Sequence, residues 1–254
     1  MGVYTVVMRV EPYTVNSIVH VIKRGTRGLP IVREEVDRRR FVQLLYYSND
    51  TYRDEFWEQS VKGLDFLGRP EMWPEQKPLV HVVAWTLLPN HFHLVLKALD
   101  NGSVAKFMQR LCGSMATHYN AKYDERGSLF QGAYRSRTAE MQGGDYLRTL
   151  AIYVMVKNVF EMYKGGLRRA LENFDNAYEW AIRYPYSSLS HYAGKPATSS
   201  KFLTTDIFSE LFESPREFKA FARESMRDRL EQMNELEAQE WGVPGRPKKQ
   251  LRLV

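Results

Sequence analysis

Residues 79–97 decide the fold: LVHVVAWT (Leu79–Thr86) is followed, after LLPN, by HFHLVLK (His91–Lys97). Each stretch is short and mostly apolar, as expected of a buried strand, and Pro89 and Asn90 between them are turn residues. Two strands joined by so short a break pair antiparallel. The sequence therefore predicts a buried antiparallel hairpin.

On both sides of this hairpin, predicted strands alternate with predicted helices. They are a strand at Ser17–Ile22, a helix at Glu34–Tyr47, a helix capped by Ser103, an extended segment at Leu129–Arg137 and a helix capped by Asp145. After Ser103, apolar residues recur every three or four positions, which is typical of a helix with one buried face. Residues 50–78 are irregular and rich in Gly and Pro, so we predict an insertion or a long connection there.

The composition changes at about Gly165. Ser214, Pro215 and Glu217 combine a capping box with proline at the first helical position, and an amphipathic stripe then continues to Trp241. The sequence thus predicts a catalytic domain at residues 1–165, a helical C-terminal extension at 166–242 and a basic tail at 243–254.

Composition and charge narrow the class of protein. The 254 residues carry 36 Lys plus Arg against 30 Asp plus Glu, and this balance favours a polyanionic partner or simply a basic surface. The single cysteine, Cys112, excludes an internal disulfide framework and fits a reducing cytosol. No signal peptide or membrane-spanning run is evident, so we expect a cytoplasmic protein without a membrane partner.

His91 and His93 are the strongest chemical signal in the chain. Because side chains alternate along a strand, these two imidazoles lie on one face and Phe92 lies on the other. Two neutral imidazoles on one face can bind a divalent metal ion. The alternative is a pair of histidines on the solvated face of an edge strand.

The residues around the pair resemble a known signature. Leu87–Val95 (LLPNHFHLV) is similar to the motif of the HUH single-tyrosine transposases, and more narrowly of the REP-associated tyrosine transposases. Three further segments resemble that family in the same order: His20–Gly25 with Pro30 and Ile31, Gly127–Gly132 with Tyr134–Ser136, and Tyr184–Ser188. The resemblance spans about residues 17–192.

The resemblance implies an α+β, ferredoxin-like fold, in which an antiparallel sheet carries the histidine pair and has helices on one face. It also implies cleavage of single-stranded DNA beside a hairpin, with one tyrosine nucleophile and one divalent ion, Mg²⁺ or Mn²⁺. His91 and His93 would hold the metal, which would polarise the scissile phosphate. The tyrosine would form a 5′-phosphotyrosine linkage and allow strands to be rejoined.

In the family, the nucleophile lies four residues before an Asn or Gln that completes the metal site. Tyr153 matches the nucleophile, but Lys157 stands four residues later and Asn158 five. Either a π-type bulge returns Asn158 to the face of Tyr153 as a metal ligand, or Lys157 takes the partner place and stabilises a phenolate. A third interpretation is that Tyr153 is a core residue and nicking is lost.

Several basic residues are candidate DNA contacts. They are Lys23, Arg24, Arg27, Arg135 and Arg137, with Arg246, Lys248 and Lys249 in the tail. The stretch Pro244–Lys249 (PGRPKK) resembles the core of an AT-hook, which would place arginine in a narrow minor groove. A disordered basic terminus and a solvated strand face are the alternatives.

Three functions are therefore open. The first is a DNA transposase-type endonuclease that nicks and rejoins single-stranded DNA next to hairpins. The second is a domesticated protein that binds hairpin nucleic acid and has lost nicking. The third, a metallo-hydrolase of another phosphoester, is disfavoured because the sequence shows no clear cluster of acids around the histidines. The sequence leaves open whether the protein is a monomer or a homodimer.

Overall fold

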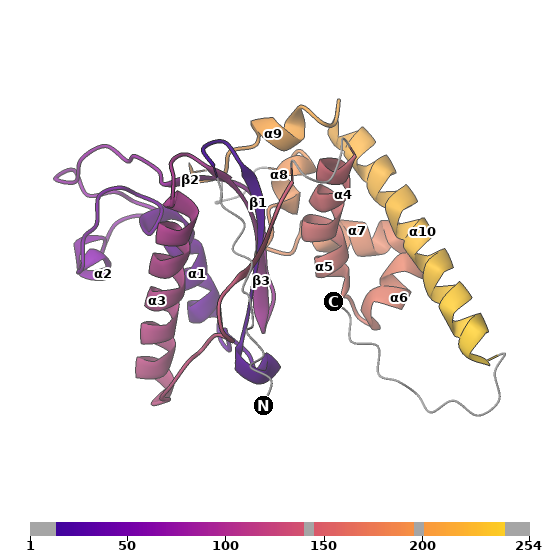
Figure 1. Cartoon of the computed structure of the whole chain (residues 1–254), viewed down its shortest axis with the longest axis horizontal. Helices are drawn as coiled ribbons and strands as arrows, with labels where there is room; N and C mark the ends of the chain where they lie inside the picture. Colours follow the sequence, from indigo (N-terminus) through magenta and orange to yellow (C-terminus); the bar gives the residue numbers. More distant parts are fainter. Residues whose placement is uncertain (1–13, 140–144, 196–200, 242–254) are drawn as a thin grey trace, which may run out of the picture.

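The computed structural model describes residues 14–139, 145–195 and 201–241. Its centre is a four-stranded antiparallel sheet in the order β2-β3-β1-β4. The strands are β1 (Ile18–Arg24), β2 (Val80–Leu87), β3 (His91–Ala98) and β4 (Arg135–Thr138). The predicted hairpin is thus formed by β2 and β3, and it supplies half of the sheet (Figure 1).

The order of elements gives the ferredoxin-like topology. The chain runs β1, α1, β2, β3, α3, β4, and β3 is inserted antiparallel between β1 and β2. Strand β4 then pairs with the free edge of β1. The predicted α+β class and antiparallel sheet are confirmed by this arrangement.

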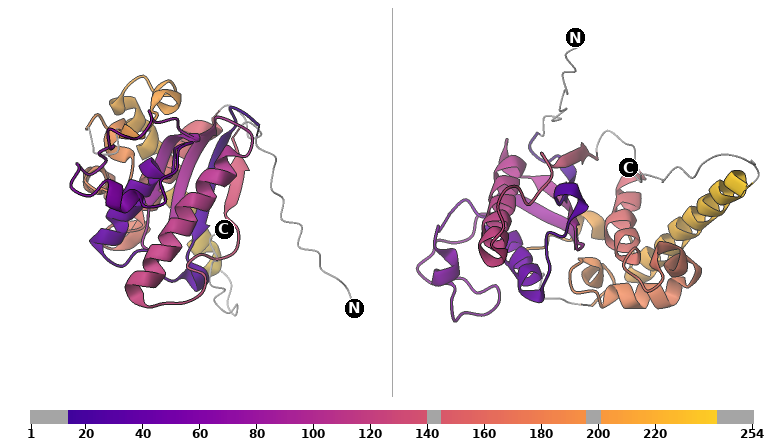
Figure 2. Two further views of the ribbon diagram at one scale, coloured as in Figure 1. Left: turned by 90° about the vertical axis from the view of Figure 1, so that its left-hand side faces the viewer. Right: turned by 90° about the horizontal axis from the view of Figure 1, so that it is seen from below.

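Helices α1 (Glu35–Tyr47) and α3 (Ser103–Tyr123) cover one face of the sheet (Figures 1 and 2). Aromatic packing joins them to the strands: the ring of Phe41 lies 5.0 Å from that of Phe92 and 6.2 Å from that of Trp85, centre to centre. Helix α3 begins at Ser103 itself, and Gly102, in the left-handed region at φ 74°, occupies the N-cap position predicted for Ser103.

A buried carboxylate ties α1 to α3. Asp37 is inaccessible to solvent and accepts hydrogen bonds from Lys122 Nζ at 2.8 Å and Tyr123 Oη at 2.6 Å. The backbone N–H groups of Arg33 and Glu34 also donate to it. Burial alone would raise the pKa of Asp37, but these hydrogen bonds hold it well below its usual range.

Residues 50–78, where the sequence predicts an insertion or a long connection, connect α1 to β2. The N–H of Thr51 donates to the carbonyl of Lys77 at 2.8 Å and closes the segment at its base. Within it, α2 (Trp57–Ser60) is a single turn, and Trp57 packs against Tyr47 of α1 with ring centres 4.8 Å apart.

The opposite face of the sheet is covered as well, by the chain after β4 (Figure 1). Side chains from β2 and β3, among them Ala84 and Val95, share an apolar cluster with these later helices. The helices are α4 (Tyr146–Ile152), the π-helix η2 (Tyr153–Lys157), α5 (Asn158–Phe160), α6 (Gly166–Glu172), α7 (Phe174–Ile182), α8 (Leu189–Tyr192), α9 (Asp206–Ser209) and α10 (Pro215–Trp241). The family resemblance implied helices on one face, so this second layer is an addition.

Helix α10 begins as the sequence predicts. Ser214 Oγ accepts a hydrogen bond from the N–H of Glu217, and Glu217 also pairs with Arg148 of α4. One apolar cluster runs from α4 to α10, across the predicted boundary at residue 165, and that boundary stays a prediction. None of the described helices is both long enough and apolar enough to span a bilayer.

Candidate functional site

Strand register gathers the candidate residues on one face of the sheet. His93 lies between Ile22 of β1 and Thr86 of β2, and His91 lies opposite Arg24. On the other side of β1, Arg137 of β4 lies opposite His20. Because directly paired residues project to the same face, the two histidines face the layer that contains η2 rather than α1 and α3.

The hydrogen bonds around His91 determine which of its ring nitrogens carries the proton. The amide nitrogen of Asn90 donates to Gly28 O at 3.1 Å, so its amide oxygen faces His91 Nδ1 at 2.7 Å. That oxygen only accepts, and therefore Nδ1 of His91 is the protonated nitrogen. The lone pair of Nε2 is left for a metal ion, and metal-binding histidines commonly donate their other ring N–H in this way.

His93 has a hydrogen-bond partner of another kind. Its Nδ1 lies 3.0 Å from Nε2 of His20, and the two rings lie edge to edge and nearly coplanar, with centres 5.3 Å apart and an interplanar angle of 16°. The ring centres of His91 and His93 are 5.1 Å apart. All three imidazoles are buried.

Burial keeps these imidazoles neutral near pH 7. Desolvation is the main cause that lowers the pKa of His20 and of His91 to about 4, and it is assisted by Arg137 and Arg24, respectively. Desolvation, followed by the neighbouring imidazoles, lowers the pKa of His93 well below its ordinary value. A neutral imidazole is the form that binds a metal ion.

The helix that faces the histidines contains a π-type turn at Tyr153–Lys157. The N–H of Asn158 donates to the carbonyl of Tyr153, five residues back, instead of to Val154. The carbonyl of Val154 accepts from Thr86 Oγ1 at 2.7 Å, so a sheet residue next to His93 holds the bulge in place. This is the geometry that the first sequence alternative requires for Asn158.

The residues present fit a divalent metal ion in their chemistry. Asn158 is buried, and its Nδ2 has no hydrogen-bond partner. Since an amide presents either oxygen or nitrogen at such a position after rotation, Asn158 can offer an oxygen as a metal ligand. Over the ranges that the structure describes, no group of three or more His, Cys, Asp or Glu side chains is arranged to hold a metal ion.

Tyr153 lies against the imidazole pair. Its ring is nearly perpendicular to those of His93 and His20, with centre distances of 5.5 and 5.8 Å and an interplanar angle of 79° in both contacts. Burial, followed by the charge of Glu161, raises the pKa of Tyr153. Three cations oppose this shift, and they are Arg229, Arg24 and Arg137.

Lys157, the residue of the second sequence alternative, lies beside the Tyr153 ring. Its ammonium lies 5.1 Å from the centre of the Tyr153 ring, and it forms an ion pair with Glu161. The side chain of Lys157 is 8% exposed and that of Glu161 is 32% exposed. The structure therefore places Tyr153 against His93 and Lys157 against Tyr153, and Asn158 is the next residue of the same helix.

The predicted DNA contacts divide into three groups. Arg24, Arg27, Arg135 and Arg137 are exposed. Lys23 is buried, and its ammonium donates to the carbonyl of Gly132 and lies over the ring of Phe130, so the structure does not support its assignment to DNA. Arg246, Lys248 and Lys249 lie outside the described residues.

Sequence reasoning missed three residues of this site. His20 stood out only as part of a motif, although its alternation with Ile22 and Arg24 along β1 predicts the correct face. Glu161 follows Lys157 at the four-residue spacing of a helical ion pair, which was a usable signal. The sequence carries no signal for Thr86, because its hydrogen-bond partner, the carbonyl of Val154, lies 68 positions further along the chain.

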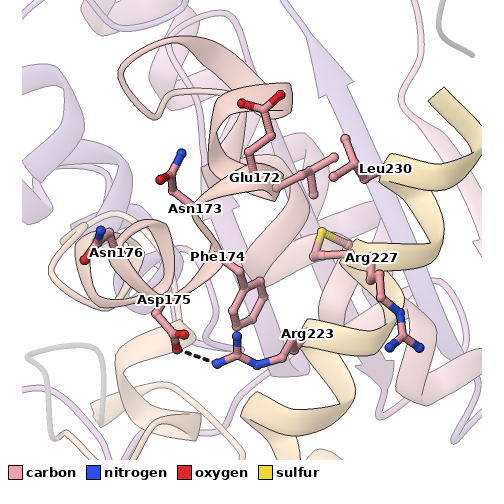
Figure 3. Close-up of a pocket in the computed structure, with 10 residues that line it drawn as sticks. Glu172, Asn173, Phe174, Asp175, Asn176, Arg223, Arg227 and Leu230 are labelled. Atoms are coloured by element: carbon pink, nitrogen blue, oxygen red, sulfur yellow. Dashed lines mark hydrogen bonds and ion pairs between the residues drawn. The ribbon is translucent and has the colours of Figure 1, made fainter. Parts of the chain in front are cut away.

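A separate pocket of about 450 Å³ lies between α6, α7 and α10 and contains none of the predicted site residues (Figure 3). Arg223 donates to Asp175 and covers the ring of Phe174 at 4.7 Å. The charges that line this pocket are therefore at least partly compensated within the protein.

Comparisons with known proteins agree with the motifs. The family described as IS200-like transposase matches residues 75–157, a range that includes His91, His93 and Tyr153 and ends one residue before Asn158. The predicted family resemblance is confirmed by this match. No curated protein matches the chain. A solved REP-associated tyrosine transposase bound to a REP hairpin is similar at 11% identity and a TM-score of 0.38, over 76% of this chain and 86% of that one.

Proposed function

We propose that this chain, which matches the IS200-like transposase family over residues 75–157, cuts and rejoins single-stranded DNA beside a hairpin. The observation that supports the proposal is the contact between the rings of Tyr153 and His93, 5.5 Å apart at their centres, on a helix whose π-turn joins the N–H of Asn158 to the carbonyl of Tyr153. Asn158 stands five residues after Tyr153, one more than the four-residue spacing of the family motif. A π-turn contains one extra residue and would therefore return Asn158 to the face of Tyr153.

The proposed metal ligands are the Nε2 atoms of His91 and His93 and the amide oxygen of Asn158. A set of two imidazoles and one oxygen suits Mn²⁺ or Mg²⁺. When bound, the ion would supply Lewis-acid stabilisation of the charge that develops on the scissile phosphate.

Tyr153 is the proposed nucleophile. Its Oη attacks phosphorus and forms a phosphotyrosine bond to the 5′ side, while the bond to the 3′ oxygen breaks and that oxygen leaves as a hydroxyl. The phenol loses its proton in this step, which burial and Glu161 oppose. The positive charges of Arg229, Arg24 and Arg137 favour the phenolate and offset part of this cost.

The exposed arginines define the path that we propose for the DNA strand. Arg24 lies opposite His91 on the sheet, and Arg137 lies opposite His20. A strand held by these cations along β1 and β4 would pass over the imidazoles and place one phosphate beside Tyr153. Phosphate contacts of this kind give position and affinity without sequence preference.

The test incubates the protein with a labelled pool of single-stranded hairpins, in Mn²⁺ or Mg²⁺, and resolves the products on a denaturing gel. We expect a covalent protein–DNA band that is absent in Tyr153→Phe and in His91→Ala. Tyr146→Phe is the matched control, because Tyr146 lies seven residues earlier on α4 and should leave the band unchanged.

Hairpin binding is measured on the same proteins by a mobility shift. If Tyr153→Phe binds the pool as well as the wild type but forms no adduct, the loss is chemical. Binding without any wild-type adduct, over the whole pool and with both metals, would instead favour the domesticated hairpin-binding protein.

A further inference from the structure

Whether His91 and His93 can each bind a metal ion depends on which ring nitrogen carries the proton. A ring can bind a metal through Nε2 only when the proton of the neutral imidazole is on Nδ1. For His91 the amide of Asn90 settles this, because its oxygen only accepts. For His93 the partner is another imidazole, His20, which can either accept or donate.

We infer that His20 is a positioning residue of this site: its Nε2 accepts the Nδ1 proton of His93 and so leaves Nε2 of His93 free for the metal. The reverse direction would place the proton of His93 on Nε2 and close that ligand position. This inference rests on the proposed function, but it concerns a residue of β1 that lies outside the proposed ligand set.

The geometry gives His20 little freedom to do anything else. It is 6% exposed, its Nε2 lies 3.0 Å from His93 Nδ1, and the two rings are nearly coplanar, at an interplanar angle of 16°. The burial of both rings and the in-plane hydrogen bond restrict rotation of the His93 ring. A buried ligand held in this way loses less conformational entropy when it binds a metal.

His20 also contacts the proposed nucleophile. Its ring meets that of Tyr153 edge to face, with centres 5.8 Å apart and an interplanar angle of 79°. The ring of His93 meets Tyr153 at the same angle, with centres 5.5 Å apart. The two nearly coplanar imidazoles thus form one surface against which the edge-to-face Tyr153 ring packs. A single side chain of β1 therefore aligns a metal ligand on β3 and the nucleophile on η2.

The first measurement is metal-free. Long-range ¹H–¹⁵N NMR of the imidazoles reports which nitrogen of His93 carries the proton. We expect the Nδ1–H form in the wild type and a mixture of both forms in His20→Leu. An Nε2–H form in the wild type would overturn the inference, whatever the protein does with DNA.

The second measurement is Mn²⁺ affinity by electron paramagnetic resonance of free Mn²⁺. We expect His20→Leu to raise the Mn²⁺ dissociation constant by about 10- to 100-fold, as loss of a hydrogen-bond partner behind a metal ligand does. His20→Gln keeps an acceptor at a similar reach and should restore most of the affinity, whereas the shorter His20→Asn should not. The matched control is His81→Leu, which removes an imidazole from β2 of the same sheet.

The outcomes separate this inference from the function on which it rests. If His91→Ala binds Mn²⁺ as tightly as the wild type, the proposed metal site is wrong. If His91→Ala loses Mn²⁺ but His20→Leu and His20→Asn keep wild-type affinity, only the role of His20 is wrong. Because the Gln and Asn variants are both polar, their comparison still decides the matter if His20→Leu fails to fold.

Discussion

The buried imidazoles give the protein a predictable response to acid. The pKa of His20 and of His91 is lowered to about 4, chiefly by burial, whereas an unfolded chain titrates at about 6.5. As the pH falls below about 6.5, the unfolded chain therefore takes up protons that the folded protein does not. The contribution of these groups to stability is full above that pH and is lost as the pH falls toward 4.

We predict that the free energy of unfolding decreases by about 2 kcal/mol per imidazole between pH 6.5 and pH 5. Urea unfolding in EDTA measures this without interference from metal. The variant His20→Leu lacks one of the groups and should show a shallower dependence. A wild-type stability that is constant over this range would contradict the burial described for these rings.

At the scale of single residues, the sequence predicts that His91 and His93 share one face, because side chains alternate along a strand. The i, i+2 spacing of His91 and His93 is local, so their common face follows from the strand alone. The contact of His20 with His93 spans 73 positions and depends on how β1 pairs with β3. A lone histidine on a strand carries no signal of such a partner.

Among the secondary-structure elements, the candidate site depends most on the π-turn of η2. It arises because the carbonyl of Val154 is held by Thr86 of β2, while the N–H of Asn158 moves to the carbonyl of Tyr153. The sequence offers a π-type bulge as one of its alternatives from the position of Asn158. Only the structure supplies Thr86, the sheet residue that stabilises it.

We predict that Thr86→Val lowers the free energy of unfolding by about 1–3 kcal/mol, because the buried carbonyl of Val154 loses its donor. It should also weaken Mn²⁺ binding, since Asn158 is no longer held in register. Ser188→Ala is the control: it removes another buried hydroxyl next to Trp85, and it should cost stability but leave Mn²⁺ binding intact. Equal Mn²⁺ affinity in both variants would show that Thr86 does not position the turn.

A second prediction at this scale concerns the link between α1 and α3. Asp37→Asn should cost about 3 kcal/mol of stability, because Lys122 loses its buried carboxylate partner. Glu34 pairs with the same lysine at the surface, so Glu34→Gln should cost less than about 1 kcal/mol. Urea unfolding of the two variants tests this. A similar loss for both would mean that burial of Asp37 contributes nothing extra.

The whole molecule combines a ferredoxin-like sheet with a second helical layer over the face that carries the histidine pair. The alternation of strands and helices predicted the first layer, since β1 to β4 follow local patterns. The position of the later helices was not predictable in this way. That position depends on apolar residues of β2 and β3, such as Ala84 and Val95, which pack against the second layer. In the sequence these residues look the same as apolar residues that pack against α1 and α3.

At this scale the net charge of +6 also bears on DNA binding. The tail residues Arg246, Lys248 and Lys249 supply three of the predicted DNA contacts. We predict that truncation after Gly242 weakens hairpin binding and lowers the slope of log affinity against log salt by about one unit for each phosphate that the tail neutralises. An unchanged slope would mean that the tail does not contact DNA.

The central claim is that Tyr153 forms a covalent bond with the 5′ phosphate of cut DNA, and peptide mass spectrometry of the adduct tests it most directly. Trypsin cuts after Arg148 and Lys157, and the peptide Thr149–Lys157 contains Tyr153 as its single tyrosine. After nuclease digestion, the account predicts that this peptide carries the mass of a 5′-linked nucleotide. A nucleotide on any other peptide, or an adduct that persists in Tyr153→Phe, would contradict it.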